Sequence, residues 1–135
     1  MCSSDLLAAE SAQFGYPEVQ RGFVPALVMN MLRRAVGEKI AFDLAATGRL
    51  LSATEAAAVG LVSRVYEDAD FEEQAGDVLR HLAGLSPSAL AFTKQQLYRL
   101  DGMEFAEGIR LSADVNAASR TTPDFRAALA AFLKK

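Results

Sequence analysis

The 135-residue chain contains one cysteine, one histidine and no long uninterrupted hydrophobic run. With Cys2 alone it can form no internal disulfide and no cluster of thiolate metal ligands, a composition that favours a reducing cytoplasm. The single histidine, His81, has no partner with which to form a metal site or a catalytic triad. We therefore expect His81 to be a surface residue.

Other absences exclude further classes of protein. No apolar stretch approaches the roughly 20 residues that a membrane helix needs, and residues 1–10 lack the basic start and apolar core of a secretory signal. The 14 Lys and Arg residues are scattered among 17 Asp and Glu, which indicates no basic surface for nucleic acid or membrane. Residues 102–108 lack the lysine and the preceding strand of a phosphate-binding loop.

What is present is the composition of a globular protein, with 51% hydrophobic and 23% charged residues. Short strands are expected at 5–9 and 61–65, and a capping box at 52–55 predicts a short helix that ends at Gly60. Apolar spacing and Gly or Pro breaks predict longer helices at 26–36, 38–46 (stopped by Gly48), about 71–83, 87–100, 103–119 and from 123 onward.

One acidic residue, Glu18, lies in a segment that is otherwise apolar and turn-forming, Phe14-Gly15-Tyr16-Pro17-Glu18. Pro17 fixes its own φ and restricts Tyr16, which predicts a stiff, extended and non-helical connection. The aromatic neighbours could shield the Glu18 carboxylate from water, and a shielded carboxylate can both take and give a proton near neutral pH. The local pattern alone favours the simpler interpretation of a solvated turn residue, because exposed glutamates far outnumber buried ones.

Four motifs follow one another along the chain: 8–25 (AAESAQFGYPE, then GFVP), 45–65 (AATGRLLSATEA, then GLVSRV), 86–94 (SPSALAFTK) and 131–135 (AFLKK). In this order they resemble the C-terminal half of the enoyl-CoA hydratase/isomerase, or crotonase, family. The resemblance covers the chain from about Leu7 onward, whereas residues 1–5 do not fit. It implies a C-terminal fragment, whose missing first half would supply most of the core sheet.

The fold that the resemblance implies is α/β and mostly helical in this chain. It would form the C-terminal part of a crotonase-like (ClpP/crotonase) spiral with a C-terminal helical layer. We expect residues 1–85 to belong to the crotonase-like core and residues 86–135 to form a helical oligomerisation region. In the family this layer packs subunits into homotrimers, often paired into hexamers. From the residues alone, the same apolar stripes are equally well explained as internal core.

The chemistry that the resemblance implies is that of an acyl-CoA enzyme of fatty acid metabolism, a lyase or an isomerase. Glu18 matches the second acid of the family and would be the general acid/base. The partner acid and at least one donor to the thioester oxyanion belong to the missing first half. Phe14, Tyr16, Pro25 and Ala26 would lie at the substrate.

Coenzyme A would enter as part of the substrate, and no other cofactor, no metal, no nucleic acid and no membrane partner is expected. Lys134 and Lys135 match the basic end of the family, which in relatives reaches a neighbouring subunit's CoA. Lysines at a helix C-terminus also interact favourably with the helix dipole, so their position has a second explanation.

Hydration of a 2-enoyl-CoA is the leading function. Most hydratases of the family carry a glycine-rich run after the matching proline, whereas residues 26–29 here are Ala-Leu-Val-Met. Ala26 keeps the N–H that could place the reactive water, although the steric room differs. Enoyl-CoA isomerisation stays open, since one carboxylate can shuttle a proton between two carbons. A non-catalytic chain whose helices only mediate association is the other alternative, and the acyl chain length is left open.

Overall fold

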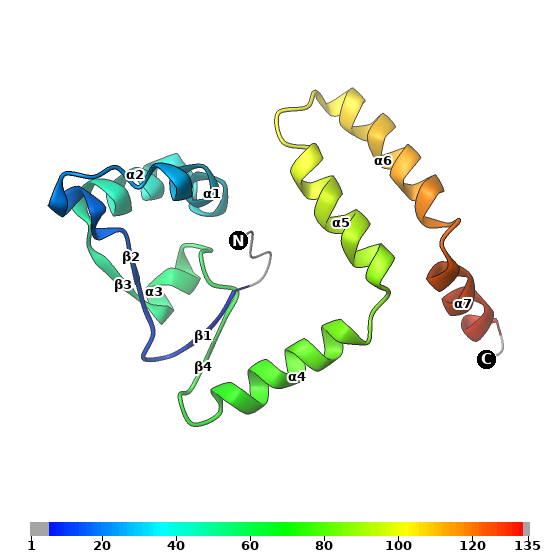
Figure 1. The fold of residues 1–135 in the computed structure, drawn as a ribbon, viewed down its shortest axis with the longest axis horizontal. Helices are drawn as coiled ribbons and strands as arrows, with labels where there is room; N and C mark the ends of the chain where they lie inside the picture. The colour runs from blue at the N-terminus through cyan, green and yellow to red at the C-terminus, as the bar shows by residue number, and fades with distance from the viewer. Residues whose placement is uncertain (1–5, 134–135) are drawn as a thin grey trace. The chain divides into compact units, whose positions relative to one another are not determined.

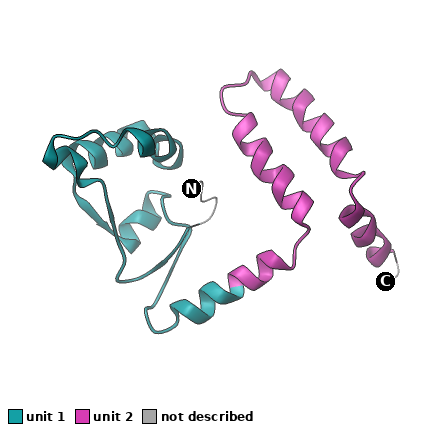
Figure 2. Cartoon of the chain, in the orientation of Figure 1, with its two compact units in different colours: residues 1–77 teal, residues 78–135 magenta. Residues whose placement is uncertain are grey.

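The computed structural model describes residues 6–133, which divide into two compact units with their boundary in the sequence between Asp77 and Val78 (Figures 1 and 2). The elements in chain order are β1 (Leu7–Ala9), β2 (Gln13–Gly15), the 3₁₀ helix η1 (Pro17–Arg21), α1 (Ala26–Val36), α2 (Glu38–Thr47), β3 (Leu50–Ser52), α3 (Ala53–Ala58), β4 (Arg64–Tyr66), α4 (Phe71–Ala83), α5 (Pro87–Arg99), α6 (Phe105–Ser119) and α7 (Pro123–Phe132). No helix among the described residues is long and apolar enough to cross a membrane.

The strands of the first unit form two short sheets within the described residues. β1 pairs in parallel with β4, which places Ala8 opposite Val65, and β2 pairs antiparallel with β3, which places Phe14 opposite Leu51. A Cβ at Gly15 of β2 would lie 2.6 Å from Cδ2 of Leu50 and 3.1 Å from the Arg49 carbonyl oxygen, so a larger residue there would displace the exposed Leu50 side chain. A parallel pair needs a long crossover, and the chain from β2 to α3 supplies it.

The α-helices α1, α2 and α3 begin where the sequence predicts and end within two residues of the predicted positions. α1 follows Pro25, and Gly48 ends α2 in the left-handed conformation with a φ of 61°. The capping box at the start of α3 is formed in full. The backbone N–H of Glu55 donates to Ser52 Oγ, and the backbone N–H of Ser52 donates to Glu55 Oε2 at 2.8 Å.

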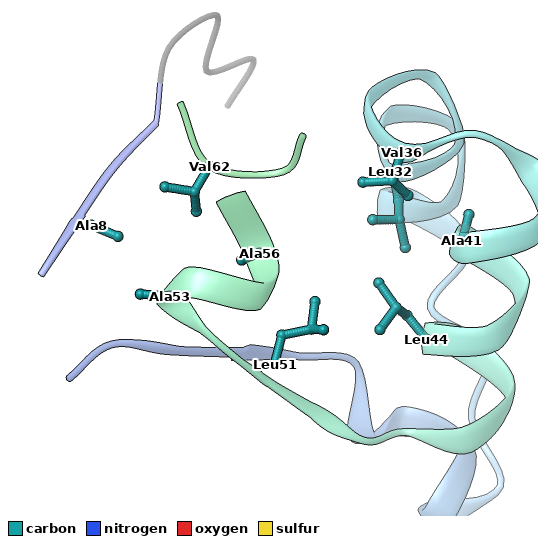
Figure 3. Packing of buried hydrophobic residues seen from close by; sticks show 9 residues of the cluster. All are labelled: Ala8, Leu32, Val36, Ala41, Leu44, Leu51, Ala53, Ala56 and Val62. Carbon is teal, nitrogen blue, oxygen red and sulfur yellow. The ribbon is translucent and has the colours of Figure 1, made fainter. Parts of the chain in front are cut away.

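The hydrophobic core of the first unit lies between α1, α2, α3 and the strands (Figure 3). Leu44 of α2 and Leu51 of β3 are its largest fully buried side chains, with 0% and 1% of their surface exposed. In Figure 3 both point toward the interior, where Leu32 and Val36 of α1 also lie. The cluster consists of Ala8, Leu32, Val36, Ala41, Leu44, Leu51, Ala53, Ala56 and Val62.

Three local predictions in the first unit are corrected by the structure. Residues Pro17–Arg21 form a 3₁₀ helix, because proline fits the first position of a helix, where its missing N–H needs no partner. Residues 50–52 form a strand, β3, that local pattern did not predict, since its partner β2 is distant in sequence. The strand expected at 61–65 begins only at Arg64, because the N–H groups of Leu61 and Val62 donate to the Ala56 carbonyl.

The second unit is wholly helical and buries little within itself. Gly108 of α6 is the one buried position among its described residues, and a Cβ there would lie 3.0 Å from Leu100 Cδ2. Gln96 of α5 donates from Nε2 to Ser112 Oγ of α6 at 2.6 Å. By contrast Phe105 and Phe132 are 84% and 74% exposed, so their apolar surface is not internal core.

A carboxylate joins the beginnings of α5 and α7. Asp124 accepts hydrogen bonds from the hydroxyl groups of Ser86 and Ser88 and from the Ser88 backbone N–H. Ser86 also caps α5, because its Oγ accepts from the Ala89 N–H at 3.1 Å. These hydrogen bonds, with the one from Ser86 the strongest, hold the pKa of Asp124 well below its usual range.

We expect Leu44→Ala to lower the free energy of unfolding by about 2–5 kcal/mol, because it empties the centre of the core. The matched control Leu27→Ala removes a side chain that is 91% exposed and should change the value by less than about 0.5 kcal/mol. Urea unfolding followed by circular dichroism measures both. Equal effects of the two variants would contradict the described core.

We expect Asp124→Asn to lower the melting temperature near neutral pH and to have a smaller effect near pH 3. The folded pKa of Asp124 lies below the unfolded value of about 3.9, so its stabilisation is present above that pH and is lost as the pH falls toward the folded pKa. Thermal melting of the whole chain, followed by helical circular dichroism, measures the difference. A variant effect that is independent of pH would contradict the assigned hydrogen bonds.

Candidate active site

Glu18 lies in η1, whose backbone is fixed at both ends. Pro17 occupies the first helical position, and Gly22 ends the helix in the left-handed conformation with a φ of 76°. The N–H of Phe23 donates to the Glu18 carbonyl at 3.0 Å, and the N–H of Gly22 donates to the Val19 carbonyl at 3.1 Å. These constraints hold the Cα of Glu18 in place, although the helix is only one or two turns long.

The Glu18 side chain is half-buried, and its two carboxylate oxygens are not equally accessible. Oε2 is shielded from solvent and has no hydrogen-bond partner among residues 6–133. A buried acceptor without a partner costs free energy, so such atoms are rare in folded proteins unless a ligand or a reaction uses them. The carboxylate therefore has free capacity to accept a proton or a hydrogen bond from a bound molecule.

Two aromatic residues that precede Glu18 line the same segment. Tyr16 is half-buried against the core, and burial raises the pKa of its phenol, with a smaller contribution from the negative charge of Glu18. Phe14 is half-buried in β2 and packs against the same core cluster. The structure thus brings Tyr16 within electrostatic reach of Glu18, whereas the contacts of Phe14 are those of a packing residue.

The turn that follows η1 holds the next predicted residues. Pro25 is buried at the start of α1, and Ala26 is exposed. The Ala26 N–H donates to the Val24 carbonyl at 2.7 Å, so it is already engaged in this structure. Lys134 and Lys135 lie outside the described residues.

One residue at the site was not found from the sequence. Gln20 donates from Nε2 to the Gly48 carbonyl at 3.2 Å, which ties η1 to the end of α2. Local sequence patterns do not reveal a bond between residues 28 positions apart. Gly48 itself was predicted, but only as the stop of a helix.

Two further features bear on what the site could hold. Within residues 6–133, no group of three or more His, Cys, Asp or Glu side chains could bind a metal ion. A hollow of about 580 Å³ lies between α1 and α2, but none of the predicted site residues lines it. Its lining consists of Met29, Arg33, Glu38, Lys39, Ala41 and Phe42.

Comparison with known proteins gives a consistent result. The family described as enoyl-CoA hydratase/isomerase matches residues 1–135. A Thermus thermophilus protein named for enoyl-CoA hydratase is 45% identical over 126 residues, which are 93% of this chain and 50% of the relative. A Rhizobium meliloti protein of the same name is 35% identical over 131 residues, 96% of this chain and 51% of the relative.

Solved structures extend the comparison to the fold. Enoyl-CoA hydratase from Bacillus anthracis superimposes with a TM-score of 0.88 at 29% identity, over 97% of this chain and 51% of that one. The described chain therefore has the fold of part of the crotonase-type hydratases. It spans about half the length of the curated relatives that it matches.

We expect Glu18→Gln to lower the pKa of Tyr16, because removal of the neighbouring negative charge favours the phenolate. The pKa should stay above its ordinary value, since burial is the larger cause of the shift. Near-ultraviolet absorbance follows the ionisation of the three tyrosines, in a chain that contains no tryptophan, and Tyr16→Phe assigns the signal. Glu72→Gln, on exposed α4, is the control, and an unchanged Tyr16 titration in Glu18→Gln would contradict the described geometry.

Proposed function

The chain belongs to the enoyl-CoA hydratase/isomerase family, as its motifs indicated, and we propose that it takes part in the hydration of a 2-enoyl-CoA with Glu18 as the general acid/base. The observation that supports this role is the shielded, unpaired Oε2 of Glu18 on a backbone that is fixed at both ends. A base in such a position can take a proton without first giving up a hydrogen bond within the protein.

In the proposed reaction, the Glu18 carboxylate removes a proton from water as the water oxygen bonds to the β carbon of the enoyl group. The electrons of the double bond move toward the thioester, and the carboxylic acid of Glu18 then returns a proton to the α carbon. Negative charge develops on the thioester oxygen, and preorganised N–H donors would stabilise it by several kcal/mol. We assign those donors and the second acid to the part of the relatives' fold that this chain does not match.

The remaining predicted residues would surround the acyl group and the CoA. Tyr16 stays protonated near neutral pH, because its pKa is raised, and would present a neutral phenol beside the Glu18 carboxylate. Placement of the water by the Ala26 N–H would require the turn at 24–26 to release its hydrogen bond. Pro25 and Phe14 would shape the pocket from behind, and Lys134 and Lys135 would neutralise CoA phosphates.

We place the reaction in fatty acid metabolism, in the cytoplasm, with CoA as part of the substrate and with no other cofactor. The exposed apolar surface of α6 and α7, including Phe105 and Phe132, would be covered by further subunits in a trimer or hexamer. Because the chain spans about half of its curated relatives, we propose that turnover requires the other half of the fold as well.

Two other functions have specific support. Isomerisation of an enoyl-CoA needs one carboxylate and no positioned water, and the engaged Ala26 N–H favours it. A chain that only mediates association would use the exposed helices of the second unit and would not need Glu18.

The test is the turnover of crotonyl-CoA by the chain alone and by the chain mixed with a polypeptide that carries the unmatched half of the Thermus relative. We expect Glu18→Gln to reduce the rate by about 100-fold or more in whichever arrangement is active, and Glu72→Gln to leave it unchanged. Hydration without loss in Glu18→Gln would contradict the assigned acid/base.

The alternatives have their own outcomes in the same assay. Conversion of a 3-enoyl-CoA to the 2-enoyl product without hydration would establish the isomerase. No turnover of either substrate in either arrangement would favour the associating chain.

A further inference from the structure

We propose that Gln20 is a positioning residue, whose side-chain amide fixes the direction in which η1 presents the Glu18 carboxylate. The contacts of Gln20 do not depend on any assumption about catalysis, whereas the expected effect of Gln20 on turnover rests on the function proposed above. Gln20 lies two positions beyond Glu18 on η1, so in a helix with three residues per turn the two side chains leave from different sides. One can therefore be tied to the protein while the other faces a ligand.

The bond that makes the tie spans two elements. Nε2 of Gln20 donates to the carbonyl oxygen of Gly48 at 3.2 Å, at the C-terminal end of α2. Pro17 and Gly22 set the backbone conformation at the two ends of η1, and neither of them attaches the helix to α2 through a side-chain hydrogen bond. The bond from Gln20 provides that attachment.

The acceptor end is built to receive Gln20. Gly48 is buried with a φ of 61°, and a Cβ there would lie 2.9 Å from Gln20 Nε2 and 3.2 Å from its Cγ. A side chain at position 48 would thus occupy the place of the amide. Glycine at position 48 therefore has two effects: it ends α2, and its lack of a side chain leaves room for the Gln20 amide.

The end of α2 carries several hydrogen bonds of its own. Thr47 donates from Oγ1 to the Asp43 carbonyl at 2.7 Å, and Arg49 donates from Nε to Asp43 Oδ2 at 3.1 Å. The Gly48 N–H donates to the backbone carbonyl of Leu44, a residue whose side chain is fully buried in the core. Gln20 therefore connects η1 to a part of the chain that the core holds in place.

Gln20→Met tests the proposal, because methionine has a similar length and no donor. Tyr16 is the reporter, since the negative charge of Glu18 contributes to its raised pKa, and the position of that charge depends on how η1 lies. We expect Gln20→Met to move the pKa of Tyr16 down toward its ordinary value. The urea unfolding midpoint should fall only slightly, because one hydrogen bond to the buried Gly48 carbonyl is lost while the core is unchanged. Gln95→Met, the same substitution on exposed α5, should move neither quantity.

Two results would overturn the proposal. One is a Tyr16 titration in Gln20→Met that matches the parent chain. The other is a large drop in the unfolding midpoint with shifts at Tyr66 and Tyr98 as well, which would mark a general loosening of the structure. Both readouts are independent of enzymatic activity.

Where crotonyl-CoA is turned over, Gln20→Met should lower kcat by about 10- to 100-fold with little change in KM, as expected for a misaligned acid/base. A raised KM with unchanged kcat would contradict positioning. The proposed function fails if the Glu18→Gln variant keeps full activity. That result is independent of the Tyr16 titration in Gln20→Met, which tests the positioning role alone.

Discussion

The short helix η1 is held by Pro17 at its start, by Gly22 at its end and by the Gln20 amide on its flank. A helix of five residues has almost no intrinsic stability, because the first turn fixes several dihedrals for each hydrogen bond gained. Its conformation therefore depends on its attachments. These attachments set the direction of the Glu18 side chain. The chemistry proposed for this chain depends on that direction.

The Gln20 amide connects η1 to α2, which packs in the core of the first unit. α2 contributes Leu44 to that core and presents Gly48 at its end, so packing and site geometry share one element. Folded proteins seldom leave a buried acceptor unpaired, because this lowers the stability of the fold. The first unit tolerates the unpaired Oε2 of Glu18 because its other local features all favour the same structure. The capping box, the glycine-terminated helices and the close strand contact at Gly15 all support the same fold.

Much of this fold could be predicted from the sequence, because its helices carry their own boundary signals. Pro25, Gly48, the Ser52–Glu55 capping box and Pro123 mark helix ends through local chemistry, and the structure confirms each of them. The β3 strand could not be predicted in this way, since its three residues are defined by their partner β2. η1 was mistaken for extended chain because proline restricts the backbone equally well at the first position of a helix.

The site was predictable to a lesser degree. The family motif predicted Glu18 as the acid/base, which stays a prediction, whereas the family itself is confirmed. The unpaired state of Oε2 and the bond from Gln20 to Gly48 depend on which segments meet in three dimensions, and no spacing along the chain encodes them. Phe14, predicted at the substrate, also has a place in the core that the sequence did not reveal.

The most direct test of the account is a crystal structure with a bound acyl-CoA analogue, obtained from this chain together with the complementary half of the relatives' fold. The account predicts a Glu18 carboxylate oxygen within about 3 Å of the water or carbon that exchanges the proton. An analogue bound elsewhere, with the Glu18 side chain directed into bulk solvent, would contradict it.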